Sequence, residues 1–323
     1  MKTTSPIHHH VITGTVCAGT LLLAAAGTSA QELYESDCYT GAINEFNSSG
    51  TATTFVPSTT PVGWQLAFNS SGDLFVGNNS GPSITEIAPN GTASSFGFDF
   101  NAPAGVAVDS AGNVYVANEG NGEIVKVSPN GSSQSLFASG LGSPYFLAFN
   151  NAGALFASDW NSGNIYEIAN GTPTLYASGF QKPTGMAFNS AGDLFVANSL
   201  NQNEGYISEI TPSGTSTILS GLNDPQGLAI DNAGDLFIAV AGTGNGSIVE
   251  VNSTGTTETF STQVATPEGL AFARHRNNRH WLWWVSNLIR GQPRFAFSAM
   301  VTPCRKIPAG SNQTAGGPRM AAW

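Results

Sequence analysis

The chain repeats one short pattern about every 40 residues. Six segments place an alanine between apolar residues, mostly with glycine two positions before it and Asn or Asp two positions after it. Their central alanines are Ala67, Ala107, Ala148, Ala187, Ala229 and Ala271, with successive spacings of 40, 41, 39, 42 and 42 residues. A fixed period of this length, in a chain of short alternating apolar runs, is typical of the blades of a β-propeller.

Each repeat contains four alternating runs, which predict four antiparallel strands. In the fourth repeat we expect strands over 185–189, 193–198, 206–211 and 216–219. Asx-and-glycine turns join the first two strands, and Pro-Asn-Gly or Pro-Ser-Gly turns join the last two. Both turns fall on one face. The longer connections therefore lie on the opposite face, called here the long-loop face, where ligand recognition is expected.

Composition agrees with this fold and excludes two classes of protein. Only 10% of the 323 residues are charged and 38 are glycine, which rules out an all-α fold because long surface helices need Lys, Glu and Arg. Residues 31–273 hold two lysines, Lys126 and Lys182, against 21 acidic residues, a formal charge of -19. Because such a surface repels phosphate, we expect no nucleic-acid partner.

The two ends of the repeat region complement each other. Residues 33–50 align with 155–171 and supply the second to fourth strands of a blade without its first strand. Residues 267–272 are a first strand without successors. Three N-terminal strands and one C-terminal strand together complete a sixth blade, which removes open sheet edges. The sequence therefore predicts an all-β, six-bladed β-propeller over residues 31–273.

Residues 1–30 predict a signal peptide. Lys2 precedes an apolar stretch at 11–27, and Thr28-Ser29-Ala30 supplies the small residues that cleavage requires. The stretch falls short of the roughly 20 apolar residues that a membrane span needs, so we expect no transmembrane span in the mature chain. Cleavage would leave Cys38 and Cys304, too few for a disulfide framework. We expect a monomer that is secreted, periplasmic or on the cell surface.

Residues 274–323 break the pattern. They hold eight Lys and Arg, no acidic residue and four of the six Trp, and no blade can be traced through them. One hypothesis is a shifted reading frame just past the closing strand, which predicts poor order. The alternative is a basic aromatic arm that binds an acidic polymer or an anionic membrane surface.

The repeated pattern resembles a known family. The consensus Pro-x-Gly-[LMV]-Ala-[FVI]-[ND], followed by Gly-[DN]-[LV]-[FY]-[VI]-Ala-Asn, is similar to the NHL repeat, and more distantly to the senescence marker protein/gluconolactonase propellers, over residues 33–272. The second resemblance implies a divalent metal held by Glu, Asn and Asp at the channel mouth. Among the residues just before the first strands, only Glu268 fits that role, and Gln226 is a poor ligand for a hard cation.

Candidate site residues lie where the first strands begin and the second strands end. Trp64, Tyr145 and Trp160 are candidates for stacking on a ring of the ligand, and Gln226 and Glu268 for polar contacts with it. Asp37, Asp159 and Glu268 are candidate ligands for Ca²⁺ or another divalent cation. The structural alternative is that Asp and Asn at strand ends bind their own loop backbone, and that the aromatic rings pack against the next blade.

Catalytic chemistry has little support. Residues 31–273 contain no histidine, so they form neither a Ser-His-Asp triad nor the His-dependent elimination of streptogramin lyase-like propellers. We therefore expect a binding or scaffolding module that contacts an extracellular glycan, small molecule or protein through its long-loop face. The alternatives are a metal-dependent hydrolase resembling gluconolactonase, and a degraded reading frame whose product has no selected function.

Overall fold

The computed structural model describes residues 31–57, 63–242 and 246–273. These residues form 24 strands in six antiparallel four-stranded sheets and no helix, so the all-β six-bladed propeller is confirmed. No helix in this part of the chain is long and apolar enough to cross a membrane. The predicted signal peptide at 1–30 and the tail at 274–323 lie outside the described residues.

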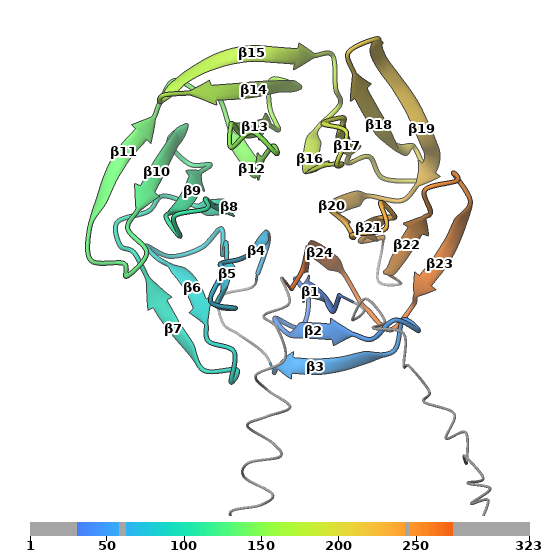
Figure 1. Ribbon diagram of the computed structural model, residues 1–323, viewed down its shortest axis with the longest axis horizontal. Coiled ribbons are helices and arrows are strands. Elements are labelled where there is room, and N and C mark those ends of the chain that lie inside the picture. The colour runs from blue at the N-terminus through green and yellow to red at the C-terminus, as the bar shows by residue number, and fades with distance from the viewer. Residues whose placement is uncertain (1–30, 58–62, 243–245, 274–323) are drawn as a thin grey trace, which may run out of the picture. The chain divides into compact units, whose positions relative to one another are not determined.

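The blades surround a central channel, and each runs from an inner strand at the channel to an outer strand at the rim (Figure 1). The closing blade contains β24 (Pro267–Phe272), β1 (Leu33–Asp37), β2 (Ile43–Phe46) and β3 (Ala52–Val56). The second blade contains β4 (Leu66–Phe68), β5 (Leu74–Val76), β6 (Ile84–Ile87) and β7 (Ala93–Phe96). The third contains β8 (Pro103–Val108), β9 (Val114–Asn118), β10 (Glu123–Val127) and β11 (Gln134–Ala138).

The remaining blades follow the same order. The fourth contains β12 (Pro144–Phe149), β13 (Leu155–Asp159), β14 (Asn164–Ala169) and β15 (Thr172–Ser178). The fifth contains β16 (Pro183–Phe188), β17 (Leu194–Asn198), β18 (Gly205–Thr211) and β19 (Gly214–Leu222). The sixth contains β20 (Pro225–Ile230), β21 (Leu236–Val240), β22 (Ser247–Val251) and β23 (Thr257–Ser261).

The predicted closure of the ring is confirmed. Strands β1 and β24 pair antiparallel, with Leu33 opposite Phe272 and Asp37 opposite Pro267. Each inner strand also contacts the inner strands of both neighbouring blades, and β24 contacts β20 on one side and β4 on the other. The two ends of the repeat region therefore share one sheet, and no blade is left with an unpartnered face (Figure 1).

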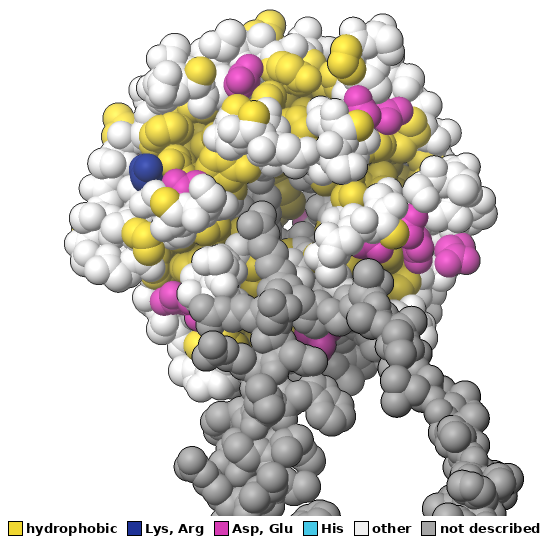
Figure 2. Space-filling model, viewed as in Figure 1, with side chains coloured by type: hydrophobic (Ala, Val, Ile, Leu, Met, Phe, Trp, Pro, Cys, Tyr) yellow, Lys and Arg dark blue, Asp and Glu magenta, His cyan; other side chains and the backbone are white. Residues whose placement is uncertain are grey.

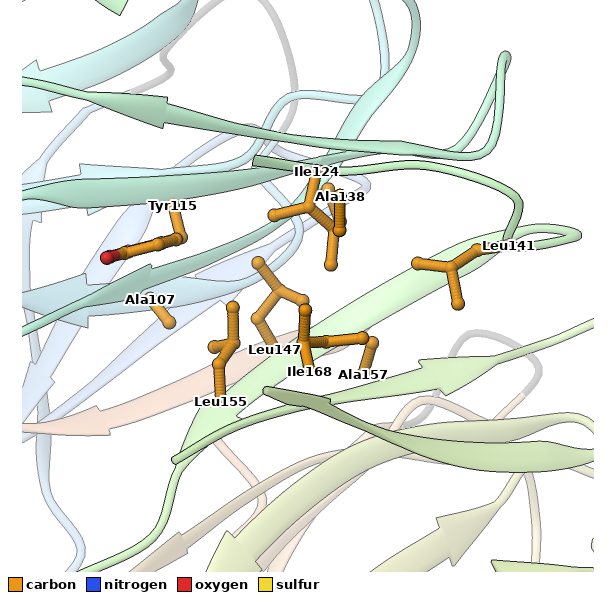
Figure 3. Packing of buried hydrophobic residues seen from close by; sticks show 10 residues of the cluster. Ala107, Tyr115, Ile124, Ala138, Leu141, Leu147, Leu155, Ala157 and Ile168 are labelled. Atoms are coloured by element: carbon orange, nitrogen blue, oxygen red, sulfur yellow. The ribbon is translucent and has the colours of Figure 1, made fainter. Parts of the chain in front are cut away.

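The hydrophobic core is divided among the six contacts between blades. Each contact encloses its own cluster of buried apolar residues drawn from both blades. Figure 3 shows the cluster between the third and fourth blades, where Ala107, Tyr115 and Ile124 face Leu147 and Leu155. Because these side chains belong to different blades, an isolated blade would expose one apolar face, and the ring is stable only as a whole.

The glycine of the Pro-x-Gly pattern allows neighbouring inner strands to approach closely. A Cβ added to Gly227 would lie 2.3 Å from the carbonyl oxygen of Glu268, and one added to Gly269 would lie 2.1 Å from that of Trp64. No real Cβ tolerates such a contact with backbone. Glycine is therefore required here for the packing of blade against blade rather than for a turn.

We expect Gly269→Ala to lower the free energy of unfolding by about 3 kcal/mol, because the added methyl group forces β24 away from the second blade. The measurement is urea denaturation of the purified chain. Gly81→Ala is the control: a Cβ at Gly81 meets nothing within 4 Å, so only its left-handed φ of +87° opposes the change, at about 1 kcal/mol. Equal losses from the two substitutions would contradict this account of the closure.

Candidate functional site

The inner strands present a ring of six side chains at the long-loop mouth of the channel. In five blades the pairing of the inner strand with its neighbour shifts register at the start of the inner strand. Such a bulge re-aims the side chain that follows the proline. The six residues at this position are Trp64, Ala104, Tyr145, Thr184, Gln226 and Glu268.

This mouth contains a pocket of about 380 Å³, a size that suits a small organic ligand. Every blade contributes to its lining, which consists of Trp64, Asn79, Glu119, Tyr145, Trp160, Lys182, Ser199, Asn201, Asp224, Gln226 and Glu268. The structure thus brings the five candidate ligand-binding residues together in one pocket. The candidate metal ligands Asp37 and Asp159 are not among its lining residues.

One wall of the pocket is aromatic. Tyr145 is buried and meets the ring of Trp64 edge-on, with 5.1 Å between centroids, and the half-buried ring of Trp160 lies 6.5 Å from Tyr145 on its other side. The ammonium group of Lys182 stands 4.8 Å from the centroid of Trp160. The rings pack against one another and also line the pocket, so the stacking and packing interpretations both describe this wall.

The orientation of the Gln226 amide is fixed by its partners. Its Nε2 donates to Asp224 Oδ1 at 2.9 Å and to Ser199 Oγ at 3.1 Å, and Ser199 Oγ donates to the same Asp224 oxygen. Only an NH₂ group can donate to a carboxylate, so Oε1 of Gln226 must be the remaining atom. That oxygen is buried without a hydrogen-bond partner. It is an acceptor that the protein leaves unused.

Glu268 supplies a second unpartnered oxygen, which is an acceptor when the carboxyl group is ionised. Its side chain is only 7% exposed, and its Oε2 is buried without a hydrogen-bond partner. Burial raises the pKa of this carboxyl group to about 8, while a hydrogen bond with the thiol of Cys38 opposes the shift. The group is therefore protonated in the free protein at neutral pH. Unpartnered buried polar atoms are costly, which is why they mark places where a ligand supplies the partner.

Asp37 and Asp159 hold loops instead of facing the channel. Asp37 Oδ1 accepts from Tyr39 N and Thr40 N, and its Oδ2 accepts from Ala265 N at 2.9 Å. Burial by itself would raise the pKa of Asp37, but hydrogen bonds from the backbone outweigh it and lower the pKa. Asp159 likewise accepts from Gly142 N at 2.6 Å and from Ser162 N at 3.1 Å.

The metal centre predicted from Asp37, Asp159 and Glu268 is not formed. Within residues 31–57, 63–242 and 246–273, no three His, Cys, Asp or Glu side chains are grouped so that they could hold a metal ion. The physical reason is that the oxygens of both aspartates already accept from backbone N–H groups, some in the loop that follows the aspartate and some in the connection that leads into the inner strand of the same blade. These contacts support the alternative that Asp37 and Asp159 bind loop backbone.

The pocket residues missed by the sequence analysis follow a simple rule. Glu119, Asn79 and Ser199 each come directly after the strand-end Asn or Asp, at the position that Trp160 occupies in the fourth blade. Because side chains alternate along an extended chain, a strand-end residue that faces its own loop leaves the next residue facing the mouth. Lys182 and Asp224 directly precede the prolines of β16 and β20. Extending the alternation of side chains one residue past the end of the second strand predicts Glu119, Asn79 and Ser199 as mouth residues.

Among the described residues, no titratable group lines the opposite end of the channel. This end contains a wider cavity of about 790 Å³, lined by residues of the six inner strands and by Gln31, Gln65, Asn151 and Asn232. Gln65 connects three blades here, since its Nε2 donates to Leu147 O and its Oε1 accepts from Val106 N and Leu147 N.

Figure 2 shows one face of the propeller, where hydrophobic side chains gather between the blades around the central opening.

A second buried acid lies near the mouth, in the closing blade. Glu35, on β1, is fully buried, and its Oε2 accepts from Asn44 Nδ2 at 2.9 Å while its Oε1 has no partner. The pKa of Glu35 is raised to about 8: burial raises it most, the hydrogen bond from Asn44 opposes the shift, and the neighbouring carboxyl groups of Asp37 and Glu268 add to it. The equivalent positions of the other blades carry Val, Ala or Ile.

Comparison with known proteins places the fold in a broad class. The NHL repeat model matches residues 100–127, which contain the inner strand and the next two strands of the third blade. No curated protein matches the chain. The chain is a six-bladed β-propeller. Its third blade matches the NHL repeat that the consensus pattern predicts.

Solved structures of the same fold share little sequence with the chain. A chain in the crystal structure of a nidogen/laminin complex superposes with a TM-score of 0.66 at 18% identity, covering 76% of this chain and 99% of that one. A streptogramin B lyase gives 0.58 at 18%, covering 75% and 86%. A catalytically inactive virginiamycin B lyase from Staphylococcus aureus, solved with quinupristin, gives 0.56 at 17%, covering 76% and 94%. These likenesses establish the fold alone.

We expect Glu35→Gln to stabilise the protein at alkaline pH. A folded pKa of about 8, above the unfolded value, means that the free energy of unfolding falls as pH rises from about 4.5 to 8. The amide cannot ionise, so the variant and the native chain should be similar at pH 5, and the variant should be a few kcal/mol more stable at pH 9. Thermal and urea unfolding across this range provides the check. Glu258→Gln, which removes the same charge from the exposed β23, is the control and should still lose stability between pH 5 and pH 8. A native-like profile in Glu35→Gln would refute the assignment.

Proposed function

We propose that the chain is a secreted, monomeric binding module. In this proposal the pocket at the long-loop mouth holds an extracellular small molecule, or an exposed part of a glycan or protein. The single observation that carries it is the pocket itself: all six blades converge on one cavity with an aromatic wall and two buried, unpartnered acceptor oxygens, on Gln226 and Glu268. A ligand that offers a ring face and hydrogen-bond donors matches both features.

Binding explains this pocket better than catalysis does. The propeller region contains no histidine, and the predicted metal trio is not formed among the described residues, so neither imidazole chemistry nor the metal-dependent hydrolysis expected of a gluconolactonase-like site is supported. The same fold occurs in a nidogen/laminin complex and in a lyase solved with quinupristin, so it serves partners of both protein and small-molecule type.

Export predicts a defined mature N-terminus. When the full chain is expressed in a secreting host, we expect intact-mass measurement of the exported protein to show a chain that begins at Gln31. Ala30→Arg should block processing, because cleavage needs a small residue at that position. Exported protein that still carries residues 1–30 would contradict the signal peptide, without bearing on the pocket.

The pocket is tested by removing its aromatic wall. A panel of fragments and oligosaccharides is screened by ligand-observed NMR against the native chain and Trp160→Ala. We expect compounds that bind the native chain to lose about tenfold in affinity, or about 1.4 kcal/mol, because the stacking face is gone. The melting temperature should fall by only a few degrees, since Trp160 is half-buried.

Tyr39→Ala is the matched control for this test. Tyr39 is 82% exposed, lies in the connection between β1 and β2 on the same face, and does not line the pocket. Ligands that lose affinity for Tyr39→Ala but not for Trp160→Ala would place the binding surface elsewhere on the long-loop face and overturn the proposal.

A further inference from the structure

We infer that the pocket at the long-loop mouth selects an organic ammonium group, that is, a protonated primary or secondary amine carried on a ring or another apolar body. This inference rests on the proposed function and specifies the chemical class of its ligand. The competing class, a neutral sugar, would also stack on the aromatic wall and donate hydrogen bonds, so the charge of the pocket and its unpartnered oxygens distinguish the two classes.

The charge of the pocket favours a cation. Glu119 and Asp224 line it, Glu268 adds a third carboxyl group that a bound cation would ionise, and Lys182 is the one basic residue among the described lining residues. Among the described residues the one ion pair is Lys126 with Asp109, so none of the three pocket acids has an ion-pair partner there. The surrounding propeller adds to the same field with its formal charge of -19 over residues 31–273. Clefts lined by charge of one sign concentrate ligands of the opposite sign.

The unused acceptors specify a donor. Gln226 Oε1 and Glu268 Oε2 belong to adjacent inner strands, β20 and β24, which are in contact, and both residues line the pocket. Each side chain is more than nine-tenths buried, so water does not replace a missing partner at low cost. An ammonium group carries several N–H donors on one atom, and its hydrogen bonds to an ionised carboxylate are about twice as strong as neutral ones.

The aromatic wall already holds an ammonium group of the protein itself. Lys182 Nζ lies 4.8 Å from the ring centroid of Trp160, within the range of a cation–π interaction. Its backbone is fixed in the left-handed region, with φ of +49°, and its carbonyl oxygen accepts from Ser199 N. The wall is therefore an environment in which a cation is stable. Because Lys182 occupies this environment, it competes electrostatically with an incoming ligand.

Ligand binding should release a proton from Glu268. Its pKa of about 8 leaves the carboxyl group neutral at pH 7 in the free protein, and a bound cation would favour the carboxylate. The titratable and charged groups around Glu268 are Cys38, Asp37, Glu35, Asp224, Tyr145, Glu119 and Lys182. Burial raises the pKa of Cys38 to about 12, and it raises that of Tyr145 as well, so neither group ionises near pH 7.

The test compares ammonium probes with neutral compounds of the same shape. Benzylammonium and cyclohexylammonium are titrated calorimetrically into the native chain, alongside benzyl alcohol, cyclohexanol and methyl β-glucoside. We expect each ammonium probe to bind at least about tenfold more tightly at pH 8 than its alcohol. Its affinity should rise about tenfold or more between pH 6 and pH 8, because Glu268 must lose its proton. Buffers of different ionisation enthalpy should show nearly one proton released at pH 6.5.

Two pairs of variants identify the residues responsible. Glu268→Gln should remove the pH dependence and the proton release, whereas Glu258→Gln, which removes the same charge from the exposed β23, should retain both. Lys182→Met should strengthen ammonium binding several-fold. Lys126→Met, which removes the same charge and a cation–π contact with Tyr115 outside the pocket, should leave it unchanged.

The outcomes separate this inference from the proposed function. If methyl β-glucoside or the alcohols bind as tightly as the ammonium probes, or if ammonium binding is independent of pH, the pocket is a binding site but the ammonium inference is wrong. If the ammonium probes bind and Trp160→Ala has no effect on them, they bind outside the pocket and the inference is again wrong. If no compound of the fragment panel or of this series binds the native chain, the proposed function fails with it.

Discussion

The pairing of β1 with β24 is the interaction on which the rest of the structure depends. Each blade buries one face only against its neighbour, so an open ring would expose the apolar residues of two blades. The closing sheet also brings Glu268, from the C-terminal end of the repeat region, next to the start of β4, where the Cβ position of Gly269 lies 2.1 Å from Trp64 O. The pairing that closes the ring therefore also completes the pocket, because Glu268 comes from the closing blade and Trp64 from the second blade packed against it.

The fold was predictable from the sequence because its determinants are local and repeated. In the fourth repeat the expected strands at 185–189 and 193–198 correspond to β16 (Pro183–Phe188) and β17 (Leu194–Asn198), with ends that differ by one or two residues. The expected outer strand at 216–219 is longer, Gly214–Leu222, since its pairing with β18 continues through residues without an apolar alternation. Blade number and closure followed from counting alone.

The site was only partly predictable, because side-chain direction at a strand end depends on the loop beyond it. The inner-strand position gave Trp64, Tyr145, Gln226 and Glu268 correctly as mouth residues, since the proline and glycine around them fix the backbone. In the sequence, Asp37 and Asp159 look equally suitable as mouth residues. Only the hydrogen bonds from Ala265 N and Gly142 N show that their carboxylates bind the backbone of the connections before β24 and β12. The buried acid Glu35 was also unforeseen, because its partner Asn44 comes from a different strand.

At the mouth, the residues that fix the loops and the residues that line the pocket are different ones. At the end of β13, Asp159 fixes the loop backbone, and Trp160, the next residue, lines the pocket. Two blades further round the mouth, Asp224 accepts from the amide NH₂ of Gln226, which leaves the amide oxygen without a partner. Because residues such as Asp159 form their hydrogen bonds with the backbone, the neighbouring pocket residues can be substituted without removing the hydrogen bonds that fix the loops.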